Sequence, residues 1–89
     1  MYLVYILKCA DNTLYTGITN DLEERVRQHS TGKGSKYLNS SRRLPVEVVH
    51  TEGGYTKSEA LKREYAIKKM KRIDKLKLID EGYEKSEGG

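Results

Sequence analysis

The chain contains no tryptophan, no phenylalanine and a single cysteine. Cys9 alone cannot form an intramolecular disulfide, and it has no companion thiol for a tetrahedral zinc site. We therefore expect Cys9 to be a packed residue at the end of a strand, in a protein of the reducing cytoplasm. The apolar segment at residues 1–7 is too short to span a membrane and lacks a signal-peptide pattern, which predicts an intracellular protein with no membrane partner.

The chain contains seven tyrosines, which are its only residues of the Phe, Trp and Tyr class. Tyrosine is used even where phenylalanine would pack equally well, so some of the hydroxyl groups are expected to take part in binding or chemistry. For any one tyrosine, the structural alternative is a ring in the core with its hydroxyl at the rim.

The length and charge limit the class of protein. We expect the 89 residues to form one domain over residues 1–82, followed by a flexible polar tail at 83–89. Lys and Arg outnumber Asp and Glu by 17 to 13, giving a net charge of +4, which favours a polyanionic partner such as nucleic acid. A solvated, solubilising surface fits the same composition.

Two short segments near the N-terminus predict a β-hairpin. Residues Tyr2–Leu7 are apolar on both faces, which is typical of a central strand, and Leu14–Ile18 resumes a strand pattern after turn-forming residues 11–12. A strict two-residue turn there would place Tyr5 and Tyr15 on opposite faces of the sheet. If the two rings share a site, the hairpin must contain an odd-length loop or a β-bulge.

Two capping-box patterns predict helices. Asn20 with Glu23 predicts a helix from residue 21 to about residue 30, and Thr56 with Glu59 predicts a second that reaches about Lys71. Between them, residues 31–43 are rich in Gly, Ser, Lys and Arg, which predicts an irregular loop.

The remaining elements complete a small α+β fold. Val46–His50 is expected to be a third strand that Gly53 and Gly54 end, and a shorter helix is expected to begin at Asp74 and stop at Gly82. The order strand, strand, helix, strand, helix, helix predicts a sheet covered by helices.

Glu64 is an unusual residue for its place on the second predicted helix. It projects from the same helix face as Ala60, Leu61 and Ile67, so its carboxylate points toward the body of the protein. A carboxylate in such a place is normally paired, protonated or bound to a metal ion. A salt bridge to Lys68 or Lys71 is the simpler alternative.

Arg25 and His29 lie one turn apart on the first predicted helix and project together. A guanidinium binds phosphate through two parallel hydrogen bonds, and an imidazole exchanges a proton near neutral pH, so the pair suits phosphodiester cleavage. An ordinary amphipathic helix, with Arg25 paired to Asp21 and His29 half-buried, is the alternative.

Four segments, in chain order, resemble the signatures of the GIY-YIG nuclease family: Val4-Tyr5-Ile6, Tyr15-Thr16-Gly17, residues 25–29 and Arg63-Glu64-Tyr65. The resemblance spans residues 2 to about 71, and the short chain is similar to small stand-alone bacterial members. It implies a three-stranded antiparallel sheet flanked by helices, and a metal-dependent endonuclease that cleaves phosphodiester bonds in DNA, with DNA favoured over RNA.

The resemblance also implies roles for individual residues. One divalent ion, Mg or Mn, would be held weakly until the substrate phosphate adds ligands. The matched catalytic residues are Tyr5, Tyr15, Arg25, His29 and Tyr37, with Glu64 as the metal ligand and Gly17 as a glycine that allows close approach to the backbone.

Basic residues around these positions are expected to follow a nucleic-acid backbone without reading its sequence. No helix-turn-helix or zinc-finger pattern is present, so specificity would come from nucleic-acid shape or from a protein partner. The basic residues are Lys33, Lys36, Arg42 and Arg43 in the loop, and Lys62, Lys68, Lys69, Lys71 and Arg72 on or after the second helix.

The sequence departs from the family pattern at two kinds of position. Val4 stands where the first signature has glycine, and no residue from Tyr65 to Gly89 is an asparagine, which repair and homing members of the family carry after the glutamate helix. A second function therefore fits the sequence: a nucleic-acid-binding module that keeps the fold with little or no cleavage activity. A protein-interaction domain with a basic face fits the composition alone.

Overall fold

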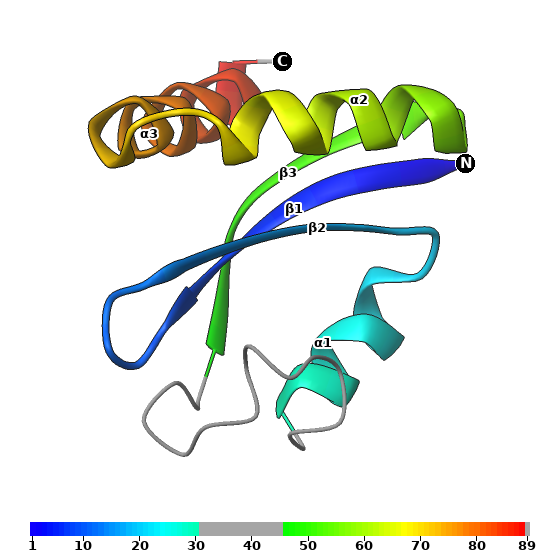
Figure 1. Ribbon diagram of the computed structural model, residues 1–89, viewed down its shortest axis with the longest axis horizontal. Helices are drawn as coiled ribbons and strands as arrows, with labels where there is room; N and C mark the ends of the chain where they lie inside the picture. The colour runs from blue at the N-terminus through cyan, green and yellow to red at the C-terminus, as the bar shows by residue number, and fades with distance from the viewer. Residues whose placement is uncertain (31–45, 89) are drawn as a thin grey trace.

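The computed structural model describes the backbone of residues 1–30 and 46–88, and the side chains of residues 1–28 and 46–81. The predicted α+β fold and its element order are confirmed (Figure 1). Helix α1 covers one face of the sheet, and α2 and α3 cover the other. No helix in the described part of the chain is long and apolar enough to cross a membrane. The elements are β1 (Tyr2–Cys9), β2 (Leu14–Thr19), α1 (Leu22–Ser30), β3 (Val46–Tyr55), α2 (Lys57–Lys68) and α3 (Arg72–Gly88).

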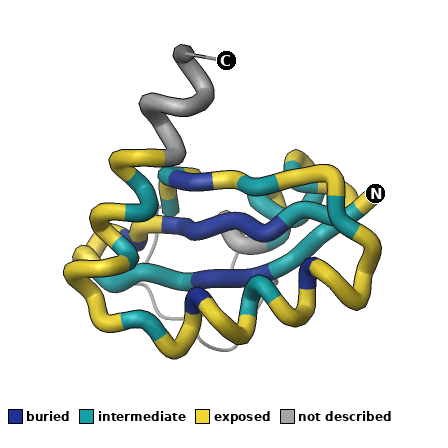
Figure 2. Tube along the Cα trace, turned by 90° about the horizontal axis from the view of Figure 1, so that it is seen from above, coloured by how far each residue is buried: buried dark blue, intermediate teal, exposed yellow. Residues whose placement is uncertain are grey.

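The sheet has the order β2-β1-β3, and both pairs of neighbouring strands are antiparallel. The predicted central strand is confirmed, because β1 lies between the two others and its residues 4–7 have no exposed surface. Figure 2 shows this buried stretch in the middle strand of the sheet, with a strand on either side of it. Strands β2 and β3 are therefore the edge strands of the sheet.

Alternation of side chains along β1 divides the core into two layers. Val4 and Ile6 pack with Ala60 and Ile67 of α2 on one face. Tyr5, Leu7 and Cys9 form the other layer, against which Leu22 and Val26 of α1 pack. Cys9 is 3% exposed at the end of β1, as expected for a packed residue.

The hairpin loop between β1 and β2 contains three residues, Ala10 to Asn12. Lys8 pairs with Leu14, the Cys9 amide donates to the Thr13 carbonyl at 2.9 Å, and the Asn12 amide donates to the Cys9 carbonyl at 2.9 Å. Asn12 adopts a φ of 69°, a left-handed conformation that asparagine tolerates and that closes three-residue hairpin loops. The predicted odd-length loop is confirmed, and it places Tyr5 and Tyr15 on the same face.

The sequence predicted the N-terminal cap of α2 correctly but misplaced that of α1. Helix α1 is capped by Asp21, whose Oδ1 accepts the Glu24 amide at 3.2 Å, so the prediction of Asn20 as the cap was wrong by one residue. Asparagine and aspartate cap an amide of the first turn about equally well, so the sequence did not decide between Asn20 and Asp21. The capping box of Thr56 and Glu59 on α2 is confirmed, although this helix ends at Lys68 rather than near Lys71.

Two glycine-based boundaries were wrong. Strand β3 continues through Gly53 and Gly54 to Tyr55, because the ladder accommodates extra residues as a bulge and Gly54 takes a φ of 82°. Helix α3 begins at Arg72 rather than Asp74 and passes through Gly82. Glycine inside a helix costs only about 1 kcal/mol relative to alanine, so it does not by itself stop one. The flexibility expected of residues 83–89 stays a prediction.

Candidate functional site

Tyr5 and Tyr15 form the centre of the candidate site. Their ring centroids lie 6.4 Å apart at an interplanar angle of 40°, on the face of the sheet that α1 covers. The Tyr5 residue is fully buried, and its ring crosses the neighbouring strand β2 above its cross-strand partner Gly17. The hydroxyl of Tyr5 is therefore carried from the central strand to the outer edge strand.

Gly17 makes that crossing sterically feasible. A Cβ atom at this position would lie 2.6 Å from Tyr5 Oη and 2.8 Å from Tyr5 Cζ, closer than such atoms approach one another. A close approach was expected at Gly17, and the group that lies against it is the phenol of Tyr5.

Replacing Gly17 by alanine is predicted to lower the free energy of unfolding by about 1–3 kcal/mol, because the buried Tyr5 ring must move to admit the methyl group. Urea denaturation followed by circular dichroism measures the change. Gly53→Ala is the matched control, since a Cβ there meets nothing closer than Leu3 Cβ at 3.8 Å. Equal stabilities of the two variants would contradict the close approach.

Arg25 reaches the Tyr5 hydroxyl from α1. Burial raises the pKa of Tyr5, and a hydrogen bond from Arg25 lowers it in part. Arg25 Nη1 also donates to Gln28 Oε1 at 3.2 Å. Its Nε–H is buried and has no hydrogen-bond partner among the described residues. An orphaned guanidinium donor beside a phenol is a group that an incoming anion would satisfy.

Glu64 comes from the opposite face of the sheet. It lies on α2, its side chain is 19% exposed, and its Oε2 is 3.4 Å from Lys68 Nζ. The ion pair with Lys68 that the sequence left as the alternative is therefore formed, although Lys68 is 54% exposed and free to exchange with water. The negative charge of Glu64 contributes to the raised pKa of Tyr5, after burial and the Tyr15 ring. This effect is electrostatic and smaller than that of the Arg25 hydrogen bond.

The remaining residues of the predicted site lie either at the surface of the described structure or outside it. Lys71 is exposed just after α2. His29 lies in the last turn of α1, but its side chain falls outside the described part of the structure. Tyr37, Lys33, Lys36, Arg42 and Arg43 also lie outside the described residues.

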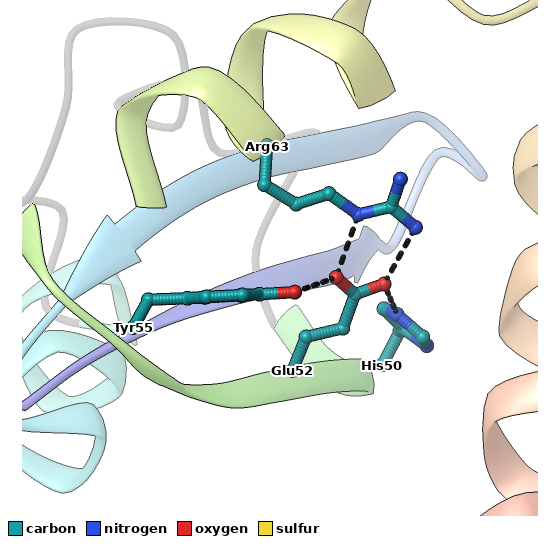
Figure 3. A network of polar contacts seen from close by, with 4 residues as sticks. All are labelled: His50, Glu52, Tyr55 and Arg63. Atoms are coloured by element: carbon teal, nitrogen blue, oxygen red, sulfur yellow. Dashed lines mark hydrogen bonds and ion pairs between the residues drawn. The ribbon is translucent and has the colours of Figure 1, made fainter. Parts of the chain in front are cut away.

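A second polar cluster, which the sequence did not indicate, joins α2 to β3 (Figure 3). The carboxylate of Glu52 accepts from Arg63 Nε at 2.7 Å and from Arg63 Nη2 at 3.0 Å. It also accepts from Tyr55 Oη at 2.9 Å and lies 2.8 Å from His50 Nε2. A carboxylate only accepts, so Nε2 carries the proton. We call these four residues the Glu52 clamp.

The Glu52 clamp fixes the orientation of α2. Burial opposes ionisation of Glu52, but the hydrogen bonds from Arg63, His50 and Tyr55 outweigh it and lower the pKa of Glu52 to about 2. Arg63 directly precedes Glu64, so a clamp that holds Arg63 against β3 also sets the direction in which Glu64 projects. His50 and Glu52 are two residues apart and therefore share a strand face. This spacing was the signal in the sequence from which part of the Glu52 clamp could have been predicted.

Comparisons with known proteins agree with this architecture. The family model described as the GIY-YIG catalytic domain matches residues 1–77. A UPF0213 protein of Staphylococcus epidermidis is 54% identical over 81 residues, covering 91% of this chain and 96% of the relative. A UPF0213 protein of Oceanobacillus iheyensis is 51% identical over 79 residues, covering 89% and 90%.

Two solution NMR structures are also similar. A UPF0213 protein from Bacillus halodurans has a TM-score of 0.57 and 40% identity, covering 90% of this chain and 84% of that one. A protein from E. faecalis has a TM-score of 0.57 and 42% identity, covering 83% and 77%. The chain therefore belongs to the GIY-YIG catalytic domain family, and its bacterial relatives are UPF0213 proteins.

Proposed function

We propose that this protein is a metal-dependent endonuclease that cleaves phosphodiester bonds in DNA and selects its substrate by structure. Its GIY-YIG domain places it in a nuclease family, for which nucleic acid is the substrate. The observation that carries the proposal is the placement of Arg25, whose Nε–H is buried and unpartnered among the described residues, beside the paired rings of Tyr5 and Tyr15. A phosphate at the edge of β2 would meet the phenol and the guanidinium, and Glu64 would approach it from α2.

Tyr5 is suited to orient a water molecule or the phosphate rather than to remove a proton. Its pKa is raised above 10.0, chiefly by burial, so the hydroxyl stays protonated and donates a hydrogen bond at neutral pH. Tyr15, 6.4 Å away between ring centroids, supports the ring from the same face, and His29 is the proposed proton acceptor.

Arg25 is suited to neutralise charge on the phosphate. Its Nε–H is buried and unpartnered among the described residues, so it donates without first giving up another contact. Preorganised donors of this kind stabilise negative charge as it develops.

Glu64 fits a single divalent ion of the Mg or Mn type. No group of three or more His, Cys, Asp or Glu side chains gathers among the described residues. Glu64 is therefore proposed as a single protein carboxylate on the ion. Mg²⁺ commonly takes one or two carboxylates and completes its shell with water and substrate phosphate. When bound, the ion would polarise the phosphate. The ammonium of Lys68, 3.4 Å from Glu64, must move aside.

A binding module with little cleavage activity is the second candidate. The ion pair between Glu64 and Lys68 favours it, because a carboxylate already neutralised by a lysine binds a metal ion less tightly. The absence of asparagine after α2 points the same way.

Incubation of the purified protein with branched, single-stranded and duplex DNA, and with RNA, separates the two candidates. Cleavage is expected with Mg²⁺ or Mn²⁺, to be strongest on branched DNA, and to stop when a chelator is added. Arg25→Ala is expected to lower the rate about a hundredfold or more. Salt-sensitive binding of all substrates without any cleavage would support the binding module instead.

A further inference from the structure

The outer face of α2 carries an exposed aromatic residue beside the candidate site. Tyr65, which directly follows Glu64, is 65% exposed, and Leu61, one turn earlier, is 46% exposed. Lys62 and Lys69 are exposed on the same side of the helix, away from the buried Ala60 and Ile67. We call Leu61, Lys62, Tyr65 and Lys69 the α2 ridge.

Among residues 60–72 the charges not held in an ion pair within the described structure are positive, because Arg63 is bound to Glu52 and Lys68 lies against Glu64, which leaves Lys62, Lys69, Lys71 and Arg72. Residues 60–72 contain six Lys or Arg residues and one carboxylate, that of Glu64. The Lys69 ammonium lies 4.9 Å from the centroid of the Tyr65 ring, a cation–π contact that orients the ring and covers one of its faces. Because Tyr65 is 65% exposed, we take the opposite face of the ring as the one available to a ligand.

An aromatic ring among lysines is the combination that binds unpaired nucleotides. The ring offers a stacking surface for a base, and the ammonium groups attract the phosphates on either side. In duplex DNA the bases are stacked on one another and cannot reach such a ring. An acidic peptide would satisfy the lysines but would leave the ring without a partner.

We propose that the α2 ridge binds a segment of single-stranded DNA, with one base stacked on Tyr65 and the adjacent phosphates near Lys62 and Lys69. The inference rests on the proposed function and extends it to the kind of DNA that is cleaved. Because Tyr65 and Glu64 lie on the same turn of α2 and project about 100° apart, a strand held on the ridge would pass beside the residue proposed to hold the metal ion. The protein then selects DNA at which paired and unpaired segments meet.

A tryptophan at position 65 provides a direct test. The chain has no tryptophan, so indole fluorescence in Tyr65→Trp reports on this position alone. With a chelator present to prevent cleavage, oligothymidylate is expected to quench the fluorescence, and a blunt hairpin duplex of equal nucleotide count is not. Absence of quenching by oligothymidylate, or stronger quenching by oligouridylate, would overturn the proposal.

Affinity measurements on substituted proteins supply the second test. Tyr65→Ala is expected to weaken oligothymidylate binding about tenfold and Tyr65→Phe to leave it unchanged, because the ring provides the stacking. Duplex binding should change less than about twofold in both. Lys69→Ala should lower the slope of log affinity against log salt by about one, whereas Arg27→Ala, on α1 at the other face of the sheet, should not.

The outcomes separate the α2 ridge from the proposed function. Quenching in a protein that cleaves no DNA would support DNA binding by the α2 ridge and contradict the proposed endonuclease activity. If Tyr65→Ala binds and cleaves branched DNA with unchanged affinity and rate, the proposal for the α2 ridge is wrong and the proposed endonuclease activity stands. A wild-type dimer that Tyr65→Ala dissociates, seen by sedimentation, would also contradict the proposal for the α2 ridge. In that case a second copy of the chain would cover the ring.

Discussion

Glu64→Gln is expected to lower the rate of metal-dependent DNA cleavage by at least about a hundredfold, since loss of a ligand should cost no less than loss of an outer-shell contact. The substitution keeps the shape of the side chain and removes its charge. Metal binding at the proposed site depends on this charge, because Glu64 is the one protein carboxylate proposed to hold the ion. The loss should therefore appear with every substrate that the protein cuts.

The fold should tolerate the change. The contact that Glu64 makes with Lys68 is long, at 3.4 Å, and Lys68 is 54% exposed, so the pair contributes about 0.5 kcal/mol or less to stability. Reduced cleavage with an unchanged unfolding curve thus reports on chemistry and not on folding.

The test compares the variant with wild type in two measurements: initial cleavage rates over a range of Mn²⁺ concentrations, and denaturation curves. Glu81→Gln, at an exposed carboxylate on α3, is the control for the loss of one negative charge. Cleavage by Glu64→Gln at the rate of the control would rule out Glu64 as the metal ligand.

Most of the fold could be predicted because it depends on local signals. The apolar segment Tyr2–Leu7 has no polar face and therefore had to be the central strand. The shared face of Tyr5 and Tyr15 required an odd-length hairpin loop, which Asn12 closes with a φ of 69°. Glycines were less informative, since Gly54 forms part of a bulge and Gly82 lies within a helix.

The candidate site could be predicted only in part, because sequence spacing does not show which elements meet at a sheet edge. The prediction that Glu64 faces the protein body followed from helical spacing, but its effect on Tyr5 depends on α2 reaching the open side of β2. The Glu52 clamp was missed because its long-range bond joins Glu52 to Arg63. That contact depends on the register of β3, which shifts twice along β1.

Glu52→Gln is expected to lower the free energy of unfolding at neutral pH by about 2 kcal/mol, and the melting temperature by about 10 °C. The substitution leaves the Arg63 guanidinium without its bidentate partner and places an amide donor against other donors. Arg63 is 33% exposed, and solvent therefore moderates a loss that would be larger for a fully buried pair. Glu47→Gln, an exposed carboxylate on the same strand, should change stability by less than about 0.5 kcal/mol.

The pH dependence identifies the charge of Glu52 as the cause. Its pKa falls from 4.5 to about 2 on folding, so its ionised form stabilises the native state above pH 4.5, and this contribution is lost as the pH falls through about 2. Glutamine does not titrate, and the stability difference between wild type and Glu52→Gln should therefore shrink steadily over that interval. Urea titrations at several pH values measure the difference, and one that stays constant down to pH 2 would mean that the lost contacts act through shape and not through charge.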